Sequence, residues 1–249
     1  SLKATTLDDG DIIYQGFVDV TARVAAAGNG TYTVANVQTA TGQDRLGGWS
    51  LVIAYRDTTQ PARNLTVFDG LKSINGSASG TIAVSGFRTP PSGTVRTTVG
   101  FVTYEGDLGL GGDGASLNNV PLSDAQHPVT NFFDSRSSRD GVLRSNATPS
   151  YANNLGFEQS MLTVGNSYIG NGDTSATIRL TTAGDVYAPG VVTFATDLYA
   201  PKLEQTKTVT DLNGGVIEQG DRLRYTIKGV NSGQDGAASF VLRDPIPAD

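Results

Sequence analysis

Short stretches in which apolar and polar residues alternate recur along most of this chain, and turn-forming residues separate them. Alternation with a period of two buries one face of a β-strand and leaves the other in solvent. Glycine supplies 31 of the 249 residues, nearly twice its usual ~7%, without a collagen-like period. The pattern predicts an all-β chain, with a jelly-roll-like antiparallel β-sandwich over residues 1–199. We expect its strands at residues 31–37, 49–55, 64–68, 81–87, 95–104, 177–181 and 191–196.

The rest of the composition excludes several kinds of site and partner. The chain has no cysteine and a single histidine, which excludes disulfides, thiol catalysis, zinc–thiolate sites and histidine-based metal clusters. The net charge is −6 and the cations are scattered among acids, so nucleic acid is not an expected partner. No apolar run reaches the ~18 residues needed to span a membrane. We expect an exported bacterial protein whose signal sequence is absent from this chain.

Three features depart from the strand pattern. Residues 19–28 are predicted to form the one helix, with Asp19 as N-cap and Gly28 as terminator. Trp49 lies in an apolar run and is expected in the core. The polar stretch 128–155 is longer than a compact domain tolerates without purpose, so we interpret it as a recognition or subunit-contact surface.

A glycine-rich loop at residues 105–118 offers oxygen ligands for calcium. Asp107, Asp113 and Asn118 are the candidate ligands, although their spacing is not that of an EF-hand. Asp-Gly pairs are also what ordinary tight turns require, so the alternative is an Asx-stabilised loop without metal. The same two readings apply, less strongly, to Asp8, Asp9, Asp11, Asp211 and Asn213.

The chain carries no convincing catalytic motif. His127 could be written into a Ser-His-Asp triad with Ser123 or Ser135, but no Gly-x-Ser-x-Gly elbow is present. We therefore interpret His127 as a solvated loop residue. A phosphate-binding loop at residues 109–114 is rejected because no lysine and no strong helix pattern follow it. The sequence predicts that the protein is not an enzyme.

The last fifty residues carry the most specific signal, because many small features recur in one order. These are a strand after Pro201, a turn at 211–215, Gly-Asp at 220–221, an aromatic strand at 223–227, Asn-Ser-Gly at 231–233 and Asp-Pro-Ile-Pro at 244–247. The order resembles the conserved immunoglobulin-like repeat found in tandem along very large bacterial and archaeal cell-surface proteins. The resemblance implies a spacer or fibre-building module without catalytic turnover. The family's repeat continues past Asp-Pro-x-Pro, so residues 200–249 are expected to form the first half of a module.

Part of the larger domain shows a second resemblance. Residues 32–37, 48–57, 64–70 and 189–197 are similar to the domain that precedes the repeats in actinobacterial-type multi-repeat surface proteins. Further strands usually precede the corresponding stretch in that family. We place the domain boundary at residues 199–201, where an X-Pro segment is a natural link.

Strand parity in the C-terminal module suggests a covalent cross-link. It places Lys207, Asn231 and Asp244 on inward-facing positions. A lysine that loses its proton in apolar surroundings can attack an Asn amide polarised by a buried carboxyl, which would form an intramolecular isopeptide bond. The alternative is that the lysine extends to solvent and the amide of Asn231 caps a turn.

Together these features favour a non-catalytic structural or adhesive component of a bacterial surface or extracellular filament. We expect it to associate with copies of itself, by head-to-tail or strand-sharing contacts, and to contact a surface glycan or protein. The alternative is a lectin-like module that grips carbohydrate with the help of calcium.

Overall fold

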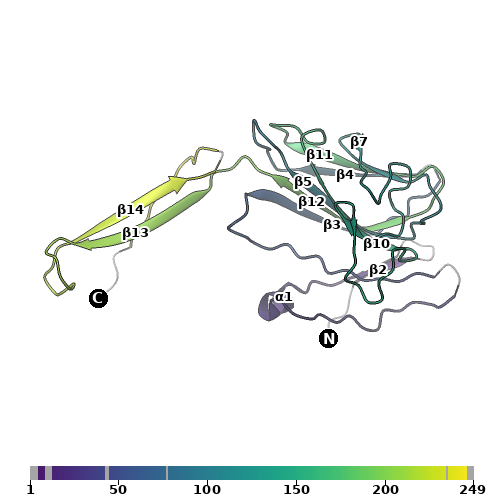
Figure 1. The fold of residues 1–249 in the computed structure, drawn as a ribbon, viewed down its shortest axis with the longest axis horizontal. Coiled ribbons are helices and arrows are strands. Elements are labelled where there is room, and N and C mark those ends of the chain that lie inside the picture. Colours follow the sequence, from purple (N-terminus) through teal and green to yellow (C-terminus); the bar gives the residue numbers. More distant parts are fainter. Residues whose placement is uncertain (1–4, 9–12, 43–44, 77, 234, 246–249) are drawn as a thin grey trace.

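Two facing, mainly antiparallel sheets form the main body of this computed structural model, which describes residues 5–8, 13–42, 45–76, 78–233 and 235–245 (Figure 1). Strands account for 35% of the residues and helix for 3%. The prediction of an all-β sandwich is confirmed. No helix among the described residues has the length and apolar character needed to cross a bilayer.

The larger sheet has six strands in the order β3-β12-β5-β10-β8-β9, and the smaller has four in the order β4-β11-β6-β7. Their antiparallel pairs are nested, β3 with β12, β4 with β11 and β5 with β10, as in a hairpin folded over on itself into a jelly roll. The bounds are β3 (Arg63–Asp69), β4 (Ser79–Ser85), β5 (Thr97–Tyr104), β6 (Gly114–Leu117), β7 (Val120–Pro121), β8 (Ser138–Arg139), β9 (Val142–Leu143), β10 (Phe157–Val164), β11 (Ser175–Thr181) and β12 (Ala188–Asp197).

The core lies between these sheets and is continuous. Alternate residues of β11 and β12 point into it, which gives the alternation that the sequence predicts, whereas the central strand β5 is buried along almost its whole length. At one end Phe133 stacks on Tyr187 with ring centroids 4.4 Å apart, and Phe101 meets Phe132 edge-on. Each such side chain contributes about 1.5–3 kcal/mol when fully buried. The aromatic cluster therefore fixes the loop that carries Phe132 and Phe133 to the sheets.

The N-terminal segment adds a two-stranded sheet of β1 (Thr5–Asp8) and β2 (Tyr14–Phe17), followed by helix α1 (Thr21–Ala27). The helix lies inside the predicted range and ends at Gly28, whose φ is +62°. Val20 rather than Asp19 occupies its N-cap position, and the Asp19 carboxylate accepts a hydrogen bond from the Thr21 amide. Gln15 fastens β2 to the sandwich, because its amide donates to the carbonyls of Gly70 and Gly190.

Two of the predicted strands are not formed. Residues 31–37 and 49–55 have no strand assignment and pair with none of the described strands. The prediction that Trp49 lies in the core is also wrong, since its side chain is 46% exposed. Alternation describes which face a strand would bury, but a strand also requires a neighbour to pair with its backbone groups. No such neighbour lies beside these segments in the part of the chain that the structure describes.

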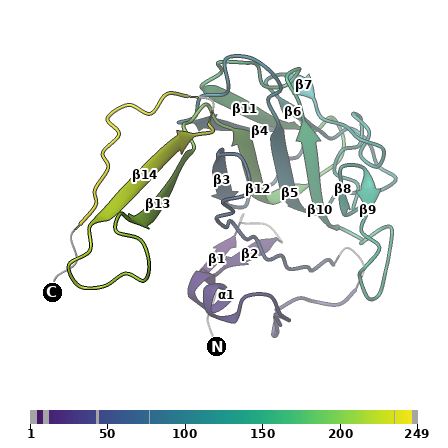
Figure 2. The same ribbon diagram turned by 60° about the vertical axis from the view of Figure 1, so that its left-hand side comes forward.

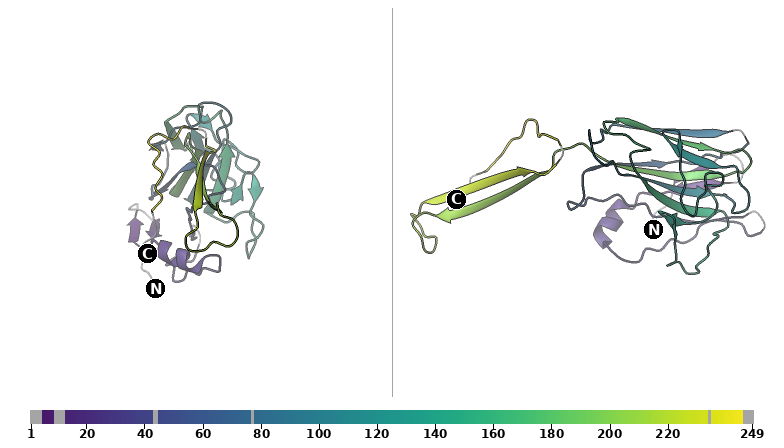
Figure 3. Two further views of the ribbon diagram at one scale, coloured as in Figure 1. Left: turned by 90° about the vertical axis from the view of Figure 1, so that its left-hand side faces the viewer. Right: turned by 45° about the horizontal axis from the view of Figure 1, so that its top comes forward.

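The C-terminal residues form a separate hairpin of β13 (Leu203–Asp211) and β14 (Leu223–Asn231). The hairpin projects away from the sandwich (Figures 1 and 3). Figure 2 shows the chain after β14 returning alongside the hairpin. The register pairs Lys207 with Ile227 and Val209 with Tyr225. The predicted parity of these strands is therefore confirmed.

Candidate functional site

The loop that follows β7 enters the core and carries the only histidine of the chain. His127 has no exposed surface, so its interpretation as a solvated residue is wrong. Phe132, Phe133 and Asp134 are also fully buried, which corrects the expectation that the whole stretch 128–155 is a surface excursion. The polar sequence predicted an exposed loop, but Phe132 and Phe133 anchor this loop inside the protein. Residues 144–155 are mostly exposed, as expected.

Both ring nitrogens of His127 have partners. Nδ1 lies 3.0 Å from the Phe132 carbonyl oxygen, which can only accept, so Nδ1 carries the hydrogen and donates it. Nε2 lies 2.8 Å from Oγ of Ser138, and in this tautomer Nε2 can accept a hydrogen bond from that hydroxyl. Oδ1 of Asp134 is 3.5 Å from Nδ1, and Oδ2 of Asp134 pairs with the Arg136 guanidinium. Ser138, His127 and Asp134 are thus arranged in sequence like the nucleophile, base and acid of a catalytic triad.

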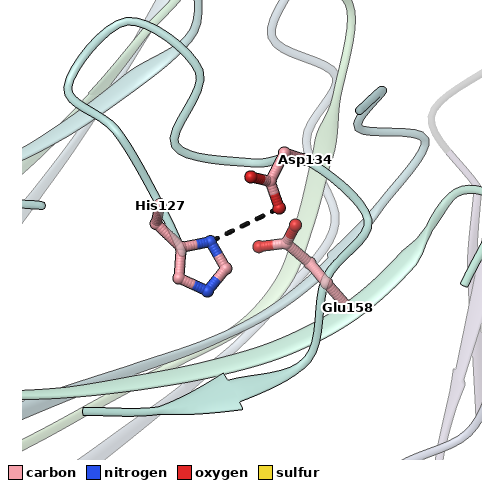
Figure 4. A group of neighbouring side chains, drawn as sticks. All are labelled: His127, Asp134 and Glu158. Carbon is pink, nitrogen blue, oxygen red and sulfur yellow. Dashed lines mark ion pairs between the residues drawn. The ribbon is translucent and has the colours of Figure 1, made fainter. Parts of the chain in front are cut away.

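Glu158 of β10 completes this buried polar network and points toward His127 and Asp134 (Figure 4). Its Oε2 accepts a hydrogen bond from the Ser135 amide at 2.9 Å. Burial, with a further contribution from the nearby charge of Asp134, raises the pKa of Glu158 well above its ordinary value. Burial therefore favours the uncharged carboxyl group of Glu158, while Asp134 forms an ion pair with Arg136.

Two chemical uses of the network can be weighed against this geometry. His127, Asp134 and Glu158 present ligand atoms within 4.8 Å of one another, as a metal ion would require. However, both ring nitrogens are already hydrogen-bonded and Asp134 is paired with a cation. Ser138 is 5% exposed, and the two main surface pockets are lined by neither Ser138 nor His127. The arrangement serves best as a buried set of satisfied hydrogen bonds that holds the loop on the sheet.

The three predicted calcium ligands do not converge. Asn118 is turned into the protein, where its amide donates to the Tyr168 carbonyl and accepts from the Thr177 amide. Asp107 is exposed. Asp113 is buried, and its Oδ1 accepts from the amides of Phe132 and Phe133. A further acid that the sequence did not single out, Asp185, lies beside Asp113.

Asp113 and Asp185 form a buried carboxyl pair. Among the described residues Oδ2 of Asp113 has no hydrogen-bond partner, and a proton held between the carboxyl groups of Asp113 and Asp185 would satisfy it. Burial is the main cause that raises the pKa of Asp113 to about 7, and the neighbouring charge of Asp185 adds to it. Burial likewise raises the pKa of Asp185. The pair joins the start of β6 to the loop before β12 through one proton.

The remaining candidate calcium ligands cap turns, end a strand or lie outside the described residues. Oδ1 of Asp211 accepts from the Asn213 amide, and Oδ1 of Asn213 accepts from the Arg222 amide, so both residues close the loop of the C-terminal hairpin. Asp8 ends β1. Asp9 and Asp11 lie outside the described residues.

The structure brings together two of the three residues proposed for an isopeptide bond. Nζ of Lys207 lies 2.6 Å from Oδ1 of Asp244 and 4.6 Å from the centre of the Tyr225 ring. Asn231 is four positions from Ile227, the partner of Lys207, which is roughly 13 Å along a strand. Oδ1 of Asn231 accepts from the amides of Lys202 and Gly233, so it caps the turn as in the alternative interpretation. Both Lys207 and Asp244 are solvent-exposed.

The hairpin presents a partly exposed face rich in apolar side chains, called its apolar face below. Odd-numbered residues of both strands share this side, where Leu203, Val209 and Tyr225 are each 44–55% exposed and the Lys207–Asp244 ion pair also lies. The even-numbered residues on the other side are mostly threonine and charged residues. Such a two-stranded hairpin is at best marginally stable in water and needs further strands or a packing surface. Among the described residues of the C-terminal part, this face is the most extensive apolar surface that no other strand covers.

The sequence carried no clear signal for the buried network. In β10 the buried positions 158 and 160 hold Glu and Ser, while the apolar Phe157 and Met161 lie on the less buried side, so the pattern does not mark Glu158 as buried. The partners of Glu158 come from a loop that no periodicity describes, so the network itself could not be assembled from sequence. Comparisons with protein-family models, curated proteins and solved structures found no match to this chain.

Proposed function

We propose that this protein is a non-catalytic structural or adhesive component of a bacterial cell surface or extracellular filament, and that it works by self-association through its β-modules. The observation that carries the proposal is the apolar face of the β13–β14 hairpin. Its Leu203, Val209 and Tyr225 side chains are about half exposed, and no further strand among the described residues pairs with the hairpin. A surface of this kind is expected to be covered when the protein works.

The size of the exposed surface supports a protein partner. Ten large apolar side chains between residues 203 and 242 are 42–81% exposed, and they are Leu203, Val209, Leu212, Val216, Ile217, Tyr225, Val230, Phe240, Val241 and Leu242. They do not all lie on one face, since Val230 is on the even-numbered side, but exposed apolar side chains in this number are typical of a surface that a protein partner covers. The acidic, cysteine-free composition is consistent with an extracellular location.

Light scattering coupled to size-exclusion chromatography tests the proposal over a range of protein concentrations. We expect concentration-dependent self-association, weakened at least tenfold by Tyr225→Asp, which places a charge on the apolar face. The matched control is Thr226→Asp, which places the same charge one residue further along β14 on the opposite face. A folded chain that stays monomeric at the highest concentration reached would overturn the proposal, as would equal effects of the two variants.

A further inference from the structure

Residues 49–55 have the sequence of a strand but no strand partner. Trp49, Leu51, Ile53 and Tyr55 stand at alternate positions, and because Val52 and Ala54 between them are apolar too, the sequence predicts a central buried strand. In the structure Ile53 is 50% and Tyr55 is 72% exposed. The segment thus has apolar side chains that the sandwich of the same chain leaves exposed.

The hairpin offers a complementary edge. β13 pairs on one side with β14 and with none of the other described strands on its outer side. An unpaired edge of this kind is a template for an added strand, which would turn the two-stranded hairpin into the three strands that a stable sheet requires.

We propose that residues 49–55 of one copy add as an antiparallel strand to the outer edge of β13 in a second copy. This inference rests on the proposed function and names the contact that performs it. If Arg56 lies opposite Glu204, the odd-numbered side chains from Trp49 to Tyr55 fall on the apolar face of the hairpin. The same register places the opposite charges of Arg56 and Glu204 next to each other on the polar face. One register therefore satisfies both the apolar pattern and the charges.

The contact is intermolecular because the start of the segment is held far from its own hairpin. Nε2 of Gln159, on β10, donates to the Trp49 carbonyl at 3.2 Å. β10 is three strands from β3 in the sheet, or roughly 14 Å, and β3 and β12 lie at the side from which the hairpin departs, as the Arg63–Asp197 pair shows. Each copy has one donor segment and one acceptor edge, which is a head-to-tail contact that propagates into a filament.

Disulfide trapping tests the contact directly, because the wild-type chain has no cysteine. Ala54 and Thr206 are opposite each other in the proposed register, and both are exposed. A mixture of the Ala54→Cys and Thr206→Cys variants is expected to give a covalent heterodimer under mild oxidation. Ala54→Cys mixed with Thr226→Cys is the control, since Thr226 lies on the same face but on β14. Equal yields from both mixtures would overturn the proposal. So would efficient disulfide formation within a single chain of the Ala54→Cys/Thr206→Cys double variant at low concentration.

A charge at the donor segment provides the second test. Ile53→Asp is expected to weaken self-association at least tenfold, whereas Leu110→Asp should not, although Leu110 is equally exposed at 49%. A synthetic peptide of residues 48–57 should compete and return the wild-type chain to monomers. If the chain associates but neither Ile53→Asp nor the peptide affects it, the strand assignment is wrong while the proposed function stands. If the wild-type chain does not associate at all, the proposed function fails with it.

Discussion

Nε2 of His127 lies 2.8 Å from Oγ of Ser138, and both side chains are buried. The histidine comes from the loop after β7, and the serine comes from β8. Their hydrogen bond therefore ties the buried loop to an edge of the larger sheet. Because neither group reaches solvent, losing one partner leaves the other without a substitute.

Removal of either side chain is expected to destabilise the fold. Ser138→Ala should lower the free energy of unfolding by about 1–2 kcal/mol, because it leaves Nε2 of His127 without a donor. His127→Ala should cost about 3 kcal/mol, since it also creates a cavity. Urea unfolding measures both. The exposed Ser123→Ala is the control and should change stability by less than ~0.5 kcal/mol. Equal stability of Ser138→Ala and the wild type would contradict a structural role.

Glu158 should tolerate the loss of its charge. Burial raises the pKa of its carboxyl group well above the ordinary value, which favours the uncharged form in the folded state. Glu158→Gln keeps an oxygen for the Ser135 amide, so we expect a change of less than about 1 kcal/mol at pH 7. Glu158→Ala should cost about 2–4 kcal/mol, because it leaves that amide unpaired and opens a cavity. A Glu158→Gln variant as unstable as Glu158→Ala would show that the charged form is required.

The sequence predicted those features of the fold that depend on a local pattern of residues. It did not predict those that depend on pairing with a segment far away in the chain. Five of the seven predicted strands of the sandwich coincide with β3, β4, β5, β11 and β12, because one face of each packs into a common core. The face on which Lys207 and Tyr225 lie was also predictable, since parity is a local property of a strand. Residues 49–55 carry the same local pattern, yet the strand is absent because pairing is not local.

The buried polar network was not predictable for a related reason. His127, Asp134 and Ser138 occur in a stretch rich in polar residues, which is typical of an exposed loop. Phe132 and Phe133 draw the stretch into the core, and the polar side chains are buried with it. In the same way Asp185 joins Asp113 across seventy residues of chain, so no spacing rule could pair them.

Mass spectrometry of the intact chain tests the isopeptide hypothesis. The expected mass is that of the unmodified sequence, because Asn231 caps a turn roughly 13 Å from Lys207 along the strands. Lys207 and Asp244 are also exposed, so the lysine does not lie in the apolar surroundings that this cross-linking chemistry requires. Loss of one ammonia that disappears in Lys207→Ala would establish the bond and require a different arrangement of the hairpin.

Calcium is not expected to stabilise the sandwich through Asp107, Asp113 and Asn118. Asn118 is committed to Tyr168 and Thr177, and Asp113 shares a proton with Asp185. Calcium requires six to eight oxygen ligands, most of them free to turn toward the ion. We expect Tm at pH 7 to be the same with millimolar calcium and with a chelator. A rise in Tm with calcium that Asp107→Asn abolishes would contradict this expectation.

The carboxyl pair of Asp113 and Asp185 should make the protein less stable as pH rises. The pKa of Asp113 is raised from 3.8 to about 7 in the folded state, so between these values the folded chain binds a proton that the unfolded chain has released. The stabilisation is fully present below pH 3.8 and is lost as pH rises through about 7. Because one pKa unit corresponds to about 1.4 kcal/mol, the total effect is on the order of a few kcal/mol.

Urea unfolding between pH 4 and pH 8 should show this loss, and Asp113→Asn should reduce it. The Asn amide keeps an oxygen for the Phe132 and Phe133 amides and provides a permanent donor toward Asp185. The variant should therefore be more stable than the wild type at pH 8 and nearly equal to it at pH 4. Asp57→Asn is the control, since Asp57 is exposed and bonds only within its own turn. Asp185 and Glu158 have raised pKa values too, so the slope in Asp113→Asn is expected to be shallower rather than zero. An unchanged slope in that variant would show that Asp113 does not hold the proton.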